Sequence, residues 1–184
     1  MLTGVGSGCQ HGIVSSSGDE TPPDLPARPG PPPAVTRPTR EDPHPHRQLT
    51  QNSPPAVHEA LFERARGLPG VTVADSCVSV PGARAFHLEA ALARGPAEAF
   101  QCRTEFAHLH PPHDGSLHLT LPAGAYDEVR RKGWGEPHPI SGTMMLFGPR
   151  DADELEVAWR VLLLSYRFAL GEPGPDPREA GEPR

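Results

Sequence analysis

Residues 105–121, EFAHLHPPHDGSLHLTL, hold four of the ten histidines in this chain of 184 residues. Apolar and polar residues alternate on both sides of the segment PPHDG, and alternation around such a turn is typical of a β-hairpin. Because side chains two residues apart in a strand point to the same face, His108 and His110 share a face. A five-residue turn over 111–115 then places His108 opposite His118. The segment predicts three imidazoles on one face of a sheet and leucines on the other.

The remaining elements follow from hydrophobic periodicity and from the positions of glycine and proline. Helices are expected at 55–68, 122–132 and 151–170, and short strands at 71–74, 77–80, 84–88 and 143–147. This pattern predicts a single α+β domain, a mainly antiparallel sheet with helices packed on one side.

Proline and glycine are concentrated toward the two ends of the chain, which has 25 prolines and 19 glycines. Segments rich in these residues and poor in large apolar side chains bury too little surface to offset the entropy of ordering. We therefore predict a disordered Pro-rich arm at 1–47, an α+β domain at 48–170 and a disordered acidic tail at 171–184.

Charge and cysteine usage limit the classes of partner and compartment. The formal net charge is −6 and no segment is basic, which argues against a nucleic-acid partner. No signal peptide or apolar run of ~20 residues is visible, so no membrane contact and a cytoplasmic location are expected. Cys77 and Cys102 fall in predicted strands and are expected to be buried free thiols. The oligomeric state is not predicted.

The histidine patch has three interpretations. The imidazoles can act as acid, base or ligand contact near neutral pH, they can bind a transition metal, or they can form a solvated polar face. No specific metal-ligand spacing is present, so we predict no bound metal and no cofactor. Ser116, close to His110 and His118, also allows a Ser-His hydrolase, although the Gly-x-Ser-x-Gly context is missing.

Glu105 is predicted by strand parity to lie on the apolar face with the leucines. A carboxylate there needs a partner, and Arg103 and Arg150 are the candidates. A strand bulge would instead turn Glu105 to the histidine side. Both alternatives remain open from the sequence.

The loop over 133–139 combines an aromatic, an acid and a base between glycines and prolines. Such loops often carry functional residues, and Trp134, Glu136 and His138 are candidate ligand contacts. The alternative is that Trp134 fills the edge of the core while the other two side chains are merely exposed.

Four motifs in order resemble one known family. They are TEFAHLHP at 104–111, DGSLHLTL at 114–121, KGWGEPHP at 132–139 and FGPR at 147–150, which precedes an acidic helix start. Over about residues 48–170 the chain resembles the luciferase domain, a small domain named after the luciferase of bioluminescent fungi and widespread in bacteria.

The resemblance implies an enzyme that adds O2 to a hydroxylated pyrone without metal or organic cofactor. The expected catalytic residues are His108, His118, His110 and Glu105, and the expected substrate contacts are Trp134, Glu136, His138 and Arg150. A non-catalytic module that binds a small aromatic molecule is the main alternative, and a His-ligated metal enzyme is the third. Imidazoles enclosed around an apolar cavity would favour the enzyme over a solvated face.

Overall fold

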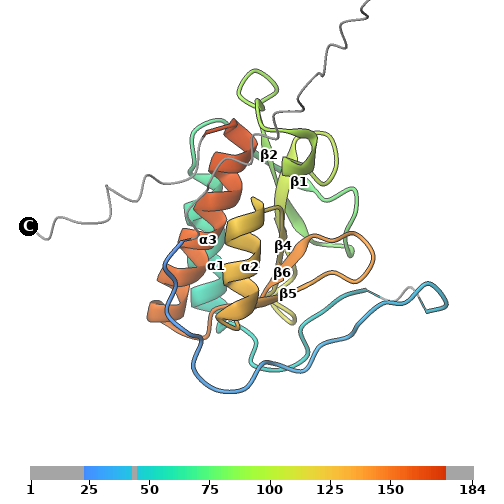
Figure 1. The fold of residues 1–184 in the computed structure, drawn as a ribbon, viewed down its shortest axis with the longest axis vertical. Coiled ribbons are helices and arrows are strands. Elements are labelled where there is room, and N and C mark those ends of the chain that lie inside the picture. Colours follow the sequence, from blue (N-terminus) through green and yellow to red (C-terminus); the bar gives the residue numbers. More distant parts are fainter. Residues whose placement is uncertain (1–22, 43–44, 173–184) are drawn as a thin grey trace, which may run out of the picture.

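The structure, a computed structural model, describes residues 23–42 and 45–172. Three α-helices and a short 3-10 helix accompany six strands, with bounds α1 Pro55–Arg66, β1 Val71–Asp75, β2 Arg84–Leu88, η1 Ala97–Ala99, β3 Glu105–Leu109, β4 Leu117–Leu119, α2 Ala123–Arg131, β5 Gly135–Pro137, β6 Met144–Leu146 and α3 Ala152–Leu170. The strands form one sheet in the order β1-β2-β3-β4-β6-β5, and every neighbouring pair is antiparallel. The three α-helices lie together on one side of this sheet (Figure 1). The predicted α+β class is confirmed.

The β3–β4 hairpin has the predicted register. Leu109 pairs with Leu117 and His108 with His118, so the leucines and the histidines point to opposite faces. Gly115 closes the turn with φ +72°, a conformation that side chains with a Cβ rarely adopt. The leucine face belongs to the hydrophobic core, together with Leu155, Leu162 and other side chains of α3. The opposite face is left for the histidines.

Two predicted elements differ from the structure. Residues 77–80 form a loop, in which the Val78 amide bonds the Ser76 hydroxyl at 3.2 Å rather than a neighbouring strand. The expected loop 133–139 contains strand β5, which pairs with β6. Gly135 permits this pairing, because a Cβ there would lie 2.4 Å from the Met145 carbonyl oxygen.

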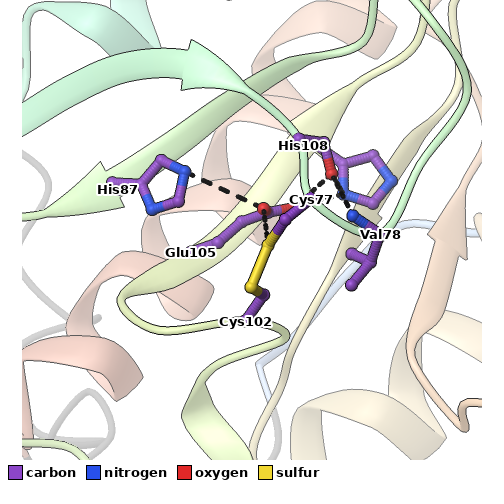
Figure 2. Close-up of a disulfide and its surroundings, with 7 residues drawn as sticks. Cys77, Val78, His87, Cys102, Glu105 and His108 are labelled. Atoms are coloured by element: carbon purple, nitrogen blue, oxygen red, sulfur yellow. Dashed lines mark hydrogen bonds and ion pairs between the residues drawn. A yellow bond between two sulfur atoms is a disulfide. The ribbon is translucent and has the colours of Figure 1, made fainter.

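The cysteine prediction is wrong for Cys77 and Cys102, which form a disulfide (Figure 2). Their Cα atoms are 6.6 Å apart, within the reach of a disulfide. Cys9 lies outside the described residues. Disulfides persist mainly in oxidising compartments. This bond therefore weighs against the predicted cytoplasmic location, which stays a prediction. Within the described ranges, the helices are too short or too polar to span a membrane.

Residues 1–47, predicted to be a disordered arm, contact the core in the part of that range that the structure describes. We call residues 23–42 and 45–50 the N-terminal segment. Leu25 is fully buried in the core, and the Trp134 indole donates a hydrogen bond of 2.7 Å to the Pro26 carbonyl. The amino-acid composition did not predict these contacts, because a few buried side chains can hold a segment whose average composition is polar. Gly171 and Glu172, the first two residues of the predicted tail, close the end of α3 through their backbone amides. Residues 1–22, 43–44 and 173–184 lie outside the described residues.

A core truncation tests this anchoring. Leu25→Ala should destabilise the protein by about 2–5 kcal/mol, because it leaves a cavity among buried side chains. Leu49→Ala is the matched control, since Leu49 is 52% exposed and lies on the same segment. Its effect should stay within about 0.5 kcal/mol. Urea unfolding of both variants measures the difference, and equal stabilities would contradict the packing of the segment.

Candidate functional site

Three imidazoles stack on the face of the sheet opposite the helices. The ring centroids of His108, His110 and His118 are 4.8–5.4 Å apart in pairs. The interplanar angles are 9–21°, so the rings are nearly parallel. All three residues are almost completely buried, at 2–4% exposure. The three-histidine patch predicted from strand parity is therefore present, and it is not a solvated face.

Two further histidines complete the cluster. His138 packs edge-on against His118 at 5.6 Å between ring centroids, and His46 lies 5.4 Å from His118 and 5.1 Å from His138. His46 comes from the N-terminal segment, and its carbonyl accepts a hydrogen bond of 3.3 Å from His118 Nε2. Sequence reasoning missed His46 because it falls in the Pro-rich range assigned to the disordered arm. We call these five residues the histidine cluster.

Glu105 lies on the histidine side of the sheet. A register shift between Phe86 and His87 marks a bulge against β3, and it turns the carboxylate away from the leucine face. Glu105 Oε1 accepts a hydrogen bond of 2.7 Å from His108 Nδ1 (Figure 2). It also accepts one of 2.8 Å from the Ser76 hydroxyl. The open question is thus resolved in favour of the bulge, and neither predicted arginine is the partner.

A second carboxylate orients His110. Asp114 Oδ2 accepts a hydrogen bond of 2.6 Å from His110 Nδ1. Asp114 Oδ1 accepts from the Gln48 amide, the Ser116 amide and the Ser116 hydroxyl, at 2.6–3.2 Å. The turn that connects the two strands therefore also holds the ring of His110. Asp114 was not singled out from the sequence, although it lies in the predicted turn.

The disulfide fixes a loop beside these pairs. Cys77 is bonded to Cys102, three residues before Glu105, and the Cys77 sulfur lies 3.7 Å from Glu105 Oε2 (Figure 2). The same loop brings the Ser79 hydroxyl to 3.0 Å from His110 Nε2. A covalent bond thus holds two serines next to two carboxylate–histidine pairs.

The histidine cluster lines a cavity of about 740 Å³. Its apolar wall is made by side chains from several elements, among them Val78, Val80, Phe100, Leu121, Ile140 and Met144. Pockets for small molecules combine such apolar walls with a few convergent polar groups. The cavity is large enough for a small molecule.

Burial keeps the cluster poorly basic. Desolvation lowers the pKa of His108 below its ordinary 6.5, and the hydrogen bond to Glu105 only partly offsets this effect. Desolvation and then repulsion from neighbouring imidazoles lower the pKa of His118 further. The same causes lower the pKa of His138 to about 4. These three imidazoles are therefore neutral at pH 7.

The two carboxylates remain ionised. Burial alone would raise the pKa of Glu105, but hydrogen bonds from His108 and Ser76 outweigh it and leave the pKa below 4.5. Burial likewise acts against ionisation of Asp114, and hydrogen bonds from His110 and Ser116 bring its pKa below 3.8. Each carboxylate therefore fixes a proton on the Nδ1 atom of its histidine.

A metal is poorly accommodated by this geometry. Nearly parallel rings direct their in-plane lone pairs in parallel, whereas a metal needs them to converge. Within the described residues no group of three or more His, Cys, Asp or Glu side chains is placed to hold a metal ion. The absence of a bound metal or cofactor stays a prediction.

The predicted substrate contacts divide into two pairs. His138 lines the cavity, and Glu136 holds His46 through a contact of 2.9 Å between Glu136 Oε1 and His46 Nε2. Trp134 is buried in the core, in agreement with the alternative weighed for it. Arg150 bonds Glu154 and lies among residues of the N-terminal segment and α3, outside the cavity lining. Neither Trp134 nor Arg150 is brought to the site.

We compared the chain with known proteins to find which protein family carries a similar domain. Residues 103–165 match the family model described as the luciferase domain. Proteins named luciferase from Neonothopanus nambi, Armillaria gallica and Armillaria mellea are each 34% identical to this chain over 80 residues. The alignments cover 39% of this chain and 30% of each relative, so the chain matches less than a third of their length. No solved structure matches the chain.

The matched residues contain the β3–β4 hairpin, β5, β6 and most of α3, and with them four of the five clustered histidines. The fold and site define a small α+β protein with a cavity lined by buried histidines. Residues 103–165 match the luciferase domain, and the resemblance seen in the four motifs is confirmed for that part of the chain.

Protonation of the cluster should oppose folding. Because the folded pKa values of His118, His108 and His138 lie below 6.5, the unfolded chain takes up more protons than the folded one as the pH falls below about 6.5. Stability is fully present above that pH and is lost progressively below it. The carboxylates lose their stabilising ionisation only at lower pH, since their ordinary values are 4.5 and 3.8.

We therefore expect the melting temperature to fall between pH 7.5 and pH 5.5, and to fall less in His118→Gln, which removes one buried titrating group. Thermal unfolding of both proteins across this range measures the effect. A melting temperature that rises on acidification would contradict the burial of neutral imidazoles.

Proposed function

We propose that this protein is a cofactor-free oxygenase-type enzyme that acts on a small enolisable aromatic or pyrone-like substrate. The observation that carries the proposal is the His108 imidazole, whose Nδ1 donates to a buried carboxylate while the ring lines a cavity. This arrangement leaves Nε2 as the basic atom. It is the arrangement that a general base requires.

The chemistry begins with removal of a proton from an enol of the substrate by His108 Nε2. The resulting imidazolium is stabilised by Glu105, which holds the ring in the required tautomer. The electron-rich enolate then transfers electrons to O2, and a carbon–oxygen bond forms. The peroxide anion recovers the proton from His108, so substrate and O2 combine into a hydroperoxide with no other reagent.

The surroundings of His108 suit an anionic intermediate. His138 is neutral, and because its Nδ1 accepts from the amides of Ile140 and Ser141, its Nε2–H can donate a hydrogen bond to the ligand. Desolvation in a largely apolar cavity strengthens such bonds to a developing negative charge. The apolar wall also holds a planar ring close to dissolved O2, which needs no polar contact.

The relatives named luciferase support an oxygen-consuming reaction, since the resemblance implies addition of O2 to a hydroxylated pyrone. The support applies to the matched domain, which covers 30% of each relative. Light emission is not part of the proposal.

The alternative is a non-catalytic module that binds a similar molecule in the same cavity. The specific observation in its favour is the amount of burial, because neutral rings and an apolar wall hold a planar aromatic ligand whether or not a proton moves. The two functions differ in oxygen consumption.

The test is oxygen uptake with hydroxypyrones and enolisable phenols. His108→Gln should lower kcat/KM by roughly 10²–10⁴-fold, the usual contribution of a positioned base. His113→Gln is the matched control, because His113 is exposed in the turn of the same hairpin. It should retain the parental rate.

Full oxygen uptake by His108→Gln would show that the base is misassigned. Ligand binding without oxygen uptake across the whole panel would replace the oxygenase with the binding module. Calorimetric titration with the same compounds provides the binding measurement.

A further inference from the structure

The loop fixed by the disulfide carries a serine that the oxygenase chemistry does not use. Ser79 lines the cavity, and its hydroxyl lies 3.0 Å from His110 Nε2. On the other side of the ring, His110 Nδ1 lies 2.6 Å from Asp114 Oδ2. A hydroxyl, an imidazole and a carboxylate are thus connected in series. This is the arrangement that activates a serine nucleophile.

The hydrogen bonds determine the direction of proton transfer. Asp114 is 1% exposed and accepts from two backbone amides as well as from Ser116, so it accepts from His110 Nδ1 as an ionised group. The proton of His110 is therefore on Nδ1, and Nε2 presents a lone pair to Ser79. The Ser79 hydroxyl must donate, which leaves its oxygen lone pairs available in the cavity.

Ser116 is not the nucleophile that sequence reasoning considered. Its hydroxyl donates to Asp114 Oδ1 at 2.6 Å and is 3.4 Å from His110 Nδ1, on the carboxylate side of the ring. It is also fully buried, at 0% exposure. Ser116 therefore orients the carboxylate, and the hydroxyl on the opposite nitrogen is that of Ser79.

The backbone around Ser79 is held in place. Cys77 anchors the loop to Cys102 on one side, and Pro81 and Gly82 complete the turn on the other, with Gly82 at φ +82°. A nucleophile held in this way loses little conformational freedom when a substrate binds. The disulfide thus contributes directly to the geometry of the serine.

We propose that Ser79, His110 and Asp114 form a catalytic triad that transfers acyl groups from small esters or lactones bound in the cavity. The proposal does not depend on the oxygenase function, because it uses a different base and a different carboxylate.

The reaction proceeds through an acyl-enzyme. Ser79 Oγ bonds to the carbonyl carbon while its proton passes to His110 Nε2. The bond to the leaving alcohol then breaks, and that alcohol takes the proton from Nε2. Water next attacks the acyl group with the same imidazole as base, releases the carboxylic acid and restores the Ser79 hydroxyl.

Labelling with a fluorophosphonate tests the triad on the full chain with its disulfide intact. The probe phosphonylates an activated serine with loss of fluoride, and tryptic mass spectrometry locates the adduct. We expect one adduct per chain, on Ser79, and none on Ser79→Ala. His110→Gln should slow labelling by roughly 10²–10⁴-fold, the contribution of the base.

Ser141→Ala is the matched control. Ser141 lines the same cavity, but its hydroxyl lies 2.9 Å from the Thr143 hydroxyl, and its contact with a histidine, His138 Nδ1, is made by the backbone amide that the substitution keeps. This variant should be labelled at the parental rate, and circular dichroism checks that all variants are folded. Absence of an adduct on Ser79, or an adduct on another serine, would overturn the proposal. So would equal labelling of His110→Gln and the parental protein.

Discussion

The site and the core both depend on the antiparallel pairing of β3 with β4. Because side chains alternate across a strand, the register that pairs Leu109 with Leu117 necessarily pairs His108 with His118. One face is buried under α3 and the other carries imidazoles. A shift by one residue would move leucines into the cavity and histidines into the core. The register that builds the core therefore also fixes the position of the proposed base.

Neighbouring segments convert this polar face into a buried site. The N-terminal segment brings His46 against His118, and Glu136 binds both His46 and Arg37 of that segment. The disulfide holds the loop with Ser76 and Ser79 over the other two rings. Removal of water lowers the basicity of the imidazoles, while buried carboxylates determine which nitrogen carries the proton. The protonation of the imidazoles in this cavity thus depends on the buried carboxylates that bond their Nδ1 atoms.

Local patterns were sufficient to predict much of the fold and part of the site. Alternation around a turn predicted the register of His108 and His118, and apolar spacing predicted the helix that the structure shows as α3. The Asp151 side chain caps this helix by accepting a hydrogen bond of 2.9 Å from the Glu154 amide. His46 was missed because its contact with His118 spans 72 residues of sequence. Strand parity placed Glu105 on the wrong face, since a bulge reverses the alternation. Cysteine spacing likewise contains no information on whether two Cα atoms approach within 6.6 Å.

The central claim is that buried carboxylates fix the tautomers of the clustered histidines and leave Nε2 of His108 as a base. Nitrogen NMR of protein labelled with 15N-histidine at pH 7 measures this directly. We predict a neutral His108 with its proton on Nδ1. His138 should carry its proton on Nε2, because its Nδ1 accepts from the amides of Ile140 and Ser141. A His108 ring protonated on Nε2, or on both nitrogens, would contradict the account.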